Sequence, residues 1–567
     1  MGGHLKNVYN DYVYFWRWAL WKVFEQSQGP GIVSFISASS YLRGPGFVGM
    51  RQHMRKVFDE LWILDLEGGS LGARKTENVF AITTPVAIAT GTRRNKPNDA
   101  TPAKVHYCRI EGTQEKKLAQ LAAVTGLKSL EWQDCFDGWM EPFLPRHNGN
   151  YYSWPLLTNI LPFQKSGVKA GRTWPIETDK STLLRRWERL ALADSNDRVL
   201  LFKNSPTGKK THQSAPHLIR PDKRDPSIAA MPSDSPCPSI IQFSFRSFDR
   251  QLLIADNRLL DRSSPELWAC DCPKQIYLTS LLTEVLGPGP AATVCASLPD
   301  LHHFRGSYGG KDVVPLWRDK AASKANLVNG LLDLIGQSFG KEPTPEEFLA
   351  YVYAILANPG YVEHFCEELT YPGPRIPITK DFRLFQRGAK IGSELIYLHT
   401  YGERMSEDRD LSIPKGKAFP SKAIPQTPDK YPEKFRYDEA TKELHVGEGT
   451  IANVDPAVFH FSVSGLKVVW SWLSYRMKDG AGKKSSSLDD IRPERWTKDF
   501  TKELLELLWV LEHTIALYPK MDSFLEEVLA STLFVADELP KPSDDERKPP
   551  EKDKHDESDQ TMLPFEE

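Results

Sequence analysis

Basic side chains on a glycine-containing loop are the first residues in this sequence whose types and spacing could do chemistry. Residues 163–174 (FQKSGVKAGRTW) set Lys165, Lys169 and Arg172 around two glycines. Cations and backbone amides on such a loop can hold the phosphate groups of a nucleic acid. A solvated basic turn has the same composition, so the residues alone leave both interpretations open.

A second basic and aromatic stretch, FSFRSFDR, occupies residues 243–250. Because side chains alternate between the two faces of a strand, we expect the phenylalanines to point inward and Arg246 and Arg250 outward. An outward guanidinium can form two hydrogen bonds with guanine or grip a phosphate. A half-buried strand with an Arg–Asp pair would explain the same pattern.

Arg375 lies between prolines in YPGPRIPIT, residues 371–379. Proline fixes φ and removes a backbone donor, so this arginine is expected on a rigid, extended segment between helices. That setting favours a buried structural ion pair over a contact with nucleic acid.

Motifs for self-sufficient catalysis are missing from the sequence. It contains no G-x-x-x-x-G-K-[ST] phosphate loop, no G-x-G-x-x-G after a predicted strand, no G-x-S-x-G elbow and no H-E-x-x-H. His302 and His303 are the one adjacent histidine pair, and neighbouring side chains usually diverge. The seven cysteines are scattered, with Cys270 and Cys272 the one close pair, which argues against zinc. We therefore expect no catalytic residue, no metal site and reduced thiols.

Composition places the chain among globular proteins of about three or four domains, with 567 residues, 40% apolar and 26% charged. From residue 537 onward there are 12 acidic and 5 basic residues, so the remainder holds 67 basic and 62 acidic ones. Such a mildly basic body permits nucleic-acid binding without requiring it. No membrane-length apolar run and no signal peptide are present, so a cytoplasmic protein without membrane contact is expected.

Hydrophobic periodicity divides the chain into regions of different predicted secondary structure. The first region alternates a helix over 12–24, a strand over 31–37, a helix over 48–58, and strands over 60–66, 79–89 and 105–110. This alternation predicts an α/β sheet, and the strand at 31–37 reads as a buried strand of a parallel sheet. The sheet looks unfinished, because the chain opens on a helix that should follow a strand and a loop.

The remainder is expected to be β-rich first and helical later. Strands are predicted over 199–203, 239–248, 251–255, 275–282 and 459–469. Helices are predicted over 325–339, 345–356, 361–369, 382–401 and 503–530. Residues 412–435 are expected to be a linker or arm, and the acidic stretch 537–567 a disordered tail.

Read together, these segments resemble a known family, the type ISP single-polypeptide restriction-modification enzymes. Three runs resemble the part of the adenine-specific methyltransferase domain that follows the catalytic NPPY loop: residues 10–25, 31–66 and 77–89. Later runs resemble the family's C-terminal specificity domain: residues 167–172, 243–260, 351–369, 374–385 and 459–476. The resemblance covers nearly the whole chain except the tail.

This sequence departs from the family pattern where methyl transfer would occur. It has no [DNS]-P-P-[YFW] motif, since its one Pro-Pro pair is Pro549-Pro550 in the charged tail. The glycine loop that approaches S-adenosylmethionine is absent as well. In the family, the NPPY loop orients the amino group of the flipped adenine while an aromatic ring stacks on the base. The resemblance therefore implies the C-terminal half of an enzyme, related to adenine-specific methyltransferases but without their catalytic loops.

The resemblance implies a fold in several parts. Residues 1–135 would be the end of the methyltransferase domain, an α/β, partial Rossmann-like sheet. A mixed α+β target-recognition region would follow, β-rich over 136–325 and helical over 326–536. The first helix and the strands at 31–37, 60–66 and 79–89 would dock against the missing cofactor-binding half.

The implied function is duplex DNA recognition, in concert with a separately encoded N-terminal methyltransferase, helicase and nuclease polypeptide or as the remnant of a broken gene. S-adenosylmethionine would bind only if that half completes the sheet. The residues implied at DNA are Lys165, Lys169, Arg172, Arg246 and Arg250, with Asn78 and Phe80 bordering the flipped-base pocket. A catalytically silent protein-interaction module and a complete methyltransferase are the alternatives.

Overall fold

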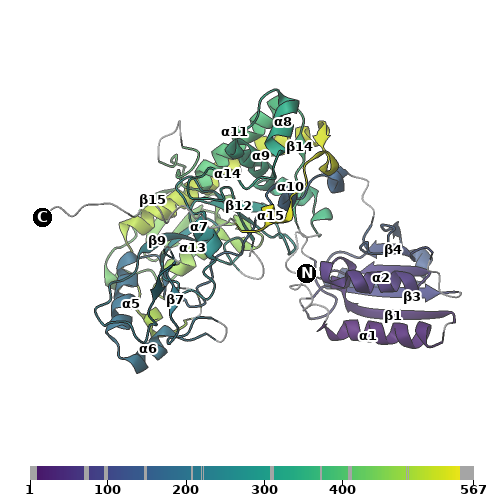
Figure 1. Ribbon diagram of the computed structural model, residues 1–567, viewed down its shortest axis with the longest axis horizontal. Coiled ribbons are helices and arrows are strands. Elements are labelled where there is room, and N and C mark those ends of the chain that lie inside the picture. The colour runs from purple at the N-terminus through teal and green to yellow at the C-terminus, as the bar shows by residue number, and fades with distance from the viewer. Residues whose placement is uncertain are drawn as a thin grey trace. The chain divides into compact units, whose positions relative to one another are not determined.

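The computed structural model divides the chain into two compact units (Figure 1). Unit 1 contains Met1–Asn150 with Val285–Gly287 and Phe365–Tyr371, and unit 2 contains Tyr151–Glu284, Pro288–His364 and Pro372–Glu567. The described residues are 9–549 apart from 28, 69–75, 83, 95–99, 146–149, 206–207, 219, 221, 307–311, 371–372, 407–411, 481 and 483. Among them, no helix has both the length and the apolar character needed to cross a membrane.

Unit 1 is built on a five-stranded sheet in the order β1-β3-β2-β4-β5. The strands are β1 (Gly31–Ala38), β2 (Glu60–Asp65), β3 (Val86–Arg93), β4 (Lys104–Arg109) and β5 (Gln133–Asp134). β1 lies at one edge and pairs antiparallel with β3 along its whole length, so the expected buried strand of a parallel sheet is wrong. Because one face of this edge strand is open, Ile32 and Ile36 are exposed.

Helices cover the sheet of unit 1. The predicted amphipathic helix forms α1 (Asp11–Leu20) and continues as the π-helix η2 (Trp21–Glu25), while α2 (Val48–Val57) follows β1. Their buried side chains share one cluster with the sheet: Trp16, Leu20, Phe24, Met54, Leu61, Ile63, Ala87 and Ala89. Gly91 in β3 is required there, because a Cβ atom would lie 2.4 Å from the ring of Phe58. A further α-helix, α3 (Gln114–Ala122), follows β4.

The strand predicted over 79–89 begins only at Val86. Residues 79–82 and 84–85 form a loop instead. Pro85 lacks a backbone donor and therefore marks the start of the strand rather than its middle.

Unit 2 combines several small sheets with helices. Its helices are α4 (Leu157–Ile160), α5 (Lys180–Leu192), α6 (Ser195–Phe202), α7 (Pro265–Ala269), α8 (Leu331–Phe339), α9 (Pro345–Leu356), α10 (Pro359–His364), α11 (Phe382–His399), α12 (Pro456–Phe459), α13 (Val468–Arg476), α14 (Lys498–Ala530) and α15 (Asp544–Arg547). Two three-stranded sheets have the orders β6-β10-β9 and β12-β11-β13. Their strands are β6 (Ile176–Glu177), β9 (Ile240–Arg246), β10 (Asp249–Ile254), β11 (Tyr277–Ser280), β12 (Ala292–Cys295) and β13 (Asp312–Pro315).

A four-stranded antiparallel sheet, β15-β18-β17-β16, lies within the region expected to be a linker and helices. It consists of β15 (Phe419–Lys422), β16 (Phe435–Asp438), β17 (Glu443–Val446) and β18 (Gly449–Ala452). Two-stranded pairs complete the unit: β7 (Ala215–Pro216) with β8 (Arg224–Asp225), β14 (Ile378–Thr379) with β21 (Leu533–Phe534), and β19 (Ser462–Val463) with β20 (Leu466–Lys467).

The helices α9 and α11 pack against each other at very close range. A Cβ atom at Gly392 would lie 1.7 Å from the carbonyl oxygen of Ala350, and one at Gly388 would lie 2.4 Å from the ring of Phe524. Glycine at both positions therefore lets α11 approach α9 and α14. The helices predicted here are present, with α8 beginning six residues later than expected.

One predicted strand is helical, and another is divided between two helices and a short hairpin. Residues 199–203 lie in and just after α6, whose N-cap Asp194 accepts hydrogen bonds from the backbone amides of Asn196 and Asp197. Residues 459–469 contain the end of α12, the short β19–β20 hairpin and the start of α13. Apolar runs of this length suit a helix or a strand equally.

The first part of the predicted disordered tail is ordered. Arg318 donates hydrogen bonds to the carbonyl oxygens of Glu546 (2.7 Å) and Lys548 (2.8 Å), and the amide of Asn329 donates to Glu546. The expectation of disorder is therefore wrong for α15 and its neighbours, while residues 550–567 lie outside the described part of the chain.

Candidate nucleic-acid interface

The predicted phosphate loop is held to two other segments of unit 2 by backbone pairing. Lys165 forms a bridge with Val313, and Lys169 forms one with Arg262. Lys165 Nζ lies 2.7 Å from Glu266 Oε1. Lys169 is half-buried and forms no ion pair with the described residues. The loop thus presents one paired and one uncompensated lysine.

Arg172, the third predicted cation of this loop, is a structural residue. Its guanidinium is fully buried and lies 4.0 Å above the Phe202 ring. It donates hydrogen bonds to Asp261 Oδ1 and to four carbonyl oxygens, those of Phe202, Lys203, Leu259 and Lys209. Burial lowers the pKa of Arg172, against the opposing effect of Asp261. The DNA contact of Arg172 stays a prediction, and it would require breaking this network, because the guanidinium has no exposed surface.

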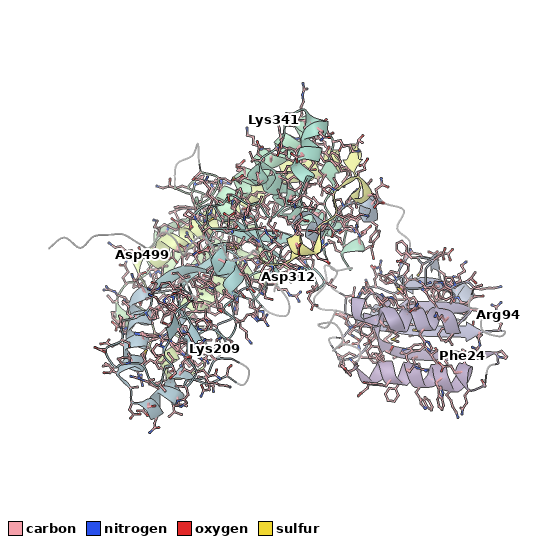
Figure 2. All side chains as sticks on the ribbon, viewed as in Figure 1. Phe24, Arg94, Lys209, Asp312, Lys341 and Asp499 are labelled. Carbon is pink, nitrogen blue, oxygen red and sulfur yellow. The ribbon has the colours of Figure 1, made fainter. Side chains whose placement is uncertain are left out.

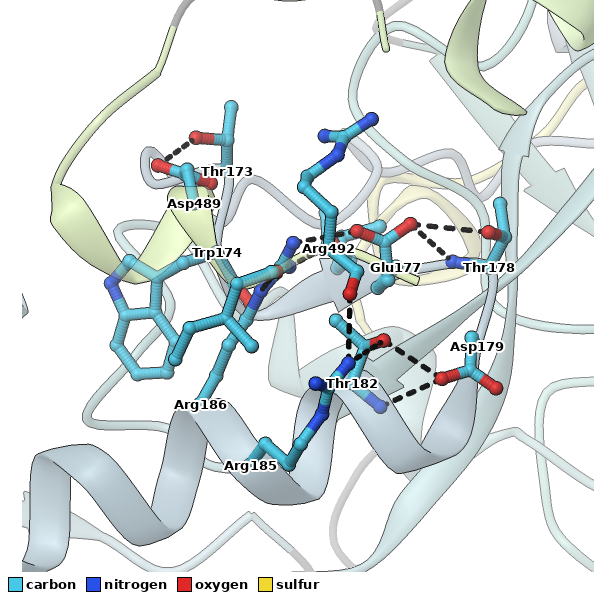
Figure 3. A network of polar contacts seen from close by, with 12 residues as sticks. Thr173, Trp174, Glu177, Thr178, Asp179, Thr182, Arg185, Arg186, Asp489 and Arg492 are labelled. Carbon is cyan, nitrogen blue, oxygen red and sulfur yellow. Dashed lines mark hydrogen bonds and ion pairs between the residues drawn. The ribbon is translucent and has the colours of Figure 1, made fainter. Parts of the chain in front are cut away.

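A network of polar contacts holds the end of this loop against the segment 485–492 (Figure 3). Thr173 donates to Asp489 at 2.8 Å. Arg186 on α5 donates to Glu177 at 2.6 Å and to the carbonyl oxygens of Trp174 and Ile491. The buried arginine therefore ties α5, β6 and a segment from the C-terminal part of the chain into one body.

Arg246 and Arg250 lie on either side of the turn of the β9–β10 hairpin. Arg246 NH1 lies 2.6 Å from Asp300 Oδ1, and its guanidinium stacks 3.8 Å from the Phe245 ring centroid. Arg250 lies 3.6 Å above Tyr401 and pairs with Glu506 (3.2 Å) and Glu403 (3.8 Å). Their side chains are 11% and 27% exposed, so Arg250 is the more accessible of the two.

The arginines and the aspartate of this stretch do not pair with one another, and each pairs with a residue outside it. Asp249 accepts a hydrogen bond from the fully buried Arg476 on α13, at 2.9 Å. Phe248 lies in the turn between β9 and β10, with a left-handed φ of 65°, so it does not continue the alternation of Phe243 and Phe245. Sequence alternation identified the strands, but it did not identify which carboxylates face the arginines.

Asn78 and Phe80 lie in the loop before β3 of unit 1. Asn78 Nδ2 donates to the carbonyl oxygen of Thr84 at 2.8 Å, and Asn78 Oδ1 accepts from the amide of Phe80 at 2.9 Å. Phe80 is 44% exposed. Asn78 therefore shapes a turn that presents an aromatic ring at the surface, and the place of both residues at a flipped-base pocket stays a prediction.

Arg375 makes hydrogen bonds rather than the expected ion pair. Its guanidinium donates to the carbonyl oxygen of Trp154 at 2.5 Å and lies 5.7 Å from the Tyr152 ring. No carboxylate among the described residues pairs with it. Its own carbonyl oxygen accepts from Tyr361, at 2.6 Å.

Tyr361 closes the sequence Asn358-Pro-Gly-Tyr361, which differs from NPPY at one position. Its ring is fully buried, and its hydroxyl is 3.3 Å from that of Tyr151. This tyrosine is part of the core of unit 2, and its ring is not available to stack on a flipped base.

Within the described ranges, no group of His, Cys, Asp and Glu could hold a metal ion. Burial raises the pKa of Cys270 to about 12, which keeps its thiol neutral. His303 is buried and hydrogen-bonded through Nδ1 to Thr279 at 2.9 Å, as expected for a histidine that diverges from its neighbour.

The fold as a whole resembles that of solved DNA-associated enzymes. At 19% identity the chain matches a structure titled as the cryo-EM DrdV–DNA complex (TM-score 0.60, 93% of this chain and 53% of that one). It matches a nuclease-deletion mutant of the type ISP restriction-modification enzyme LlaGI in complex with a DNA substrate mimic (19% identity, TM-score 0.60, 90% and 40%). It also matches the ATP-dependent type ISP enzyme LlaBIII bound to DNA (19% identity, TM-score 0.63, 96% and 34%).

These likenesses concern the fold, and the chain spans about half or less of each of those proteins. No curated protein matches the sequence. The family model described as the type ISP C-terminal specificity domain matches residues 159–507. The chain therefore belongs to the type ISP C-terminal specificity domain family.

Proposed function

We propose that this chain is the DNA-recognition portion of a restriction-modification adenine DNA methyltransferase and that it binds duplex DNA. The observation that carries the proposal is the match of the type ISP specificity domain to residues 159–507. Solved structures of similar fold are complexes with DNA or with a DNA mimic. These relatives support DNA as the partner of unit 2.

Four of the predicted cations remain candidates for DNA contact: Lys165, Lys169, Arg246 and Arg250. Lys169 is the simplest phosphate contact, because it would give up no ion pair with a described residue. Arg250 would exchange partly exposed carboxylate partners, Glu403 and Glu506, for a phosphate or a base edge. Because Arg250 would have to leave these carboxylates, the contact is favourable only where the DNA offers a phosphate or a base edge that replaces them, and a base edge makes the contact depend on the DNA sequence.

We further propose that unit 1 completes the sheet of a methyltransferase cofactor-binding half that these 567 residues do not include. β1 lies at the edge of the sheet, and its one partner among the described residues is β3. Four aromatic side chains of α1 and η2 are exposed by 41–62%: Tyr14, Phe15, Trp18 and Trp21. We call these four residues the aromatic face. An apolar surface of this kind usually marks a protein interface.

S-adenosylmethionine would then be held by the added half, and Asn78 and Phe80 would border the base pocket that the two parts form. The aromatic face equally favours the second candidate function, a catalytically silent module that binds protein partners. These possibilities are distinguished by adding a polypeptide that carries the glycine cofactor loop and NPPY, either fused to this chain or as a separate chain. Methyl transfer to DNA would be restored if unit 1 completes the methyltransferase, and would stay absent if the chain is a silent protein-binding module.

The proposal is tested by titrating the chain against a labelled duplex of mixed sequence from about 50 to about 200 mM salt. A duplex-binding protein should show a linear log–log dependence with a slope of about −0.9 for each phosphate neutralised. Absence of duplex binding over this range would contradict DNA recognition and leave the protein-binding module. Binding to S-adenosylmethionine by the chain alone would favour a complete methyltransferase instead.

A further inference from the structure

An open cavity of about 380 Å³ lies beside the predicted phosphate loop in unit 2. Three segments distant in sequence form it: residues 165–166 of the loop, Lys209, and residues 261–266 after β10. Lys209, which is labelled in Figure 2, is the lining residue from the segment in which the sequence indicated no motif. Its lining is mainly polar and charged, with Lys165, Lys209 and Arg262 as the cations.

We propose that this cavity seats a backbone phosphate of duplex DNA, with Lys209 and Arg262 as the contacting side chains and Lys169 beside them. This inference rests on the proposed function and deepens it by naming the place and the chemical group. Neither residue belongs to a recognisable motif, because Lys209 is one of two adjacent lysines in a polar loop and Arg262 is a lone cation after Asp261.

The charges around the cavity favour an anion. Asp261 is already paired with the buried Arg172 at 3.0 Å, and Glu266 is paired with Lys165 at 2.7 Å. In contrast, Lys209, Arg262 and Lys169 form no ion pair within the described part of the chain. The positive charge of these three side chains is therefore uncompensated and available to a phosphate.

Backbone geometry brings two of these cations together. Lys169 and Arg262 exchange both N–H···O bonds, at 2.8 and 3.0 Å. Residues paired in this way stand directly opposite each other in an antiparallel bridge, with their side chains on the same face. The two side chains can therefore approach one phosphate from neighbouring positions.

Arg172 acts here as a positioning residue. It donates to the carbonyl oxygen of Lys209 at 2.7 Å and to Asp261 at 3.0 Å, which joins two walls of the cavity. A Cβ atom at Gly171 or Gly208 would lie 1.9 Å from a carboxylate oxygen of Asp261, and Gly171 has a φ of 72°. Gly171 of the loop and Gly208 of the neighbouring segment thus make room for the carboxylate that orients Arg172, rather than for the phosphate itself.

The lining suits a phosphodiester better than a base or an apolar ligand. Arginine matches two phosphate oxygens with its planar fork, and lysine adds a point charge. The hydroxyl groups of Ser166 and Ser263 line the cavity and can donate to further oxygens. Inorganic phosphate has the same chemistry, so the experiment must separate the two sources.

The test compares duplex binding by the wild-type chain, the double variant Lys209→Ala/Arg262→Ala and the control Lys341→Ala/Lys390→Ala. The control removes the same charge from exposed positions of α11 and of the loop before α9 (Lys341, Figure 2). We expect the first variant to lose about tenfold in affinity at low salt for every sequence alike, and its salt slope to flatten by about one to two. The control should change both quantities much less.

A third variant should act in the opposite direction. Glu266→Gln removes a carboxylate from the cavity and releases Lys165, so duplex affinity should rise and the salt slope should steepen. Urea unfolding of all variants should match that of the wild-type chain, since the changed side chains lie at the surface of the cavity.

The possible results of this binding experiment distinguish the phosphate site from the proposed function. Unchanged affinity and slope in Lys209→Ala/Arg262→Ala would overturn the phosphate seat while leaving the proposed function in place. Failure of the wild-type chain to bind any duplex would overturn both. If inorganic phosphate at constant ionic strength stabilises the wild-type chain but not this variant, and duplex binding is equal, the cavity takes free phosphate and the DNA inference is wrong.

Discussion

The guanidinium of Arg172 is enclosed by carbonyl oxygens from two sides of unit 2 and by the Asp261 carboxylate. In water the same group would be the natural phosphate ligand of its loop. Inside the fold it donates to four carbonyl oxygens, of which only that of Phe202 has a second side-chain donor among the described residues, the Trp174 indole, and its charge is balanced by Asp261. Burial thus converts a candidate binding residue into one that positions the binding residues around it.

Replacing Arg172 by alanine should lower the free energy of unfolding by about 3–5 kcal/mol, because it leaves Asp261 as an uncompensated buried charge and the carbonyl oxygens of Lys203, Leu259 and Lys209 without their side-chain donor. Urea denaturation measures this loss. Lys169→Ala is the matched control in the same loop and should stay within about 0.5 kcal/mol of the wild type. Equal, small effects of the two changes would show that Arg172 is not structural.

Two buried histidines make the stability of unit 2 depend on pH. His399 has a neutral ring with one proton, on Nε2, because Thr514 donates its own proton to Val510 and so accepts from His399, while Tyr353 donates to Nδ1. Burial lowers the pKa of His399 and of His303 to about 3, from an ordinary 6.5.

In the unfolded chain these rings take up protons near pH 6.5, whereas the folded rings stay neutral down to about pH 3. Their contribution to stability is therefore complete above pH 6.5 and is lost as the pH falls from 6.5 toward 3. Each ring should lower the unfolding free energy by about 1.4 kcal/mol per pH unit in that window. Urea unfolding of His399→Gln should show a shallower pH dependence, and the exposed control His212→Gln should show none of this change.

At the scale of elements, length and periodicity determine which predictions hold. The helices α9 and α11 were predictable because their apolar segments are longer than a typical strand, with 12 and 18 residues. The apolar run at 199–203 was too short to indicate a helix. It is helical because α6 begins a few residues earlier, where the N-cap Asp194 stabilises its first turn. The sheet β15–β18 escaped prediction because its strands are four residues long and lie among prolines.

The strand β1 shows what element-level prediction cannot supply. Its apolar run correctly indicates a strand over residues 31–38. Its place at a sheet edge and its antiparallel partner depend on β3, which follows it by almost fifty residues. Local propensity carries no information about that pairing, because strand partners are selected by tertiary contacts.

At the scale of the whole molecule, the two units contain separate hydrophobic cores. Trp16 belongs to the core of unit 1, and Trp472, fully buried beneath Arg476, belongs to unit 2. Separate cores predict separate cooperative unfolding transitions.

Calorimetry of the chain should therefore show two transitions. Trp16→Ala should lower the midpoint of one and Trp472→Ala that of the other, since removing a buried tryptophan costs about 3–5 kcal/mol. A single transition that both substitutions shift equally would mean that the units unfold as one body.

Reading along the chain was enough to predict the family, the long helices, most strands of unit 1 and the presence of cations near 165–172 and 246–250. These features depend on residue type and local spacing, which can be read along the chain. Tertiary structure alone decided which cations are buried, which carboxylates pair with them, and that Lys209 and Arg262 lie beside Lys165. The reason is physical: the availability of a charge depends on desolvation and on partners that are dozens to hundreds of residues away, and only the folded chain brings them together.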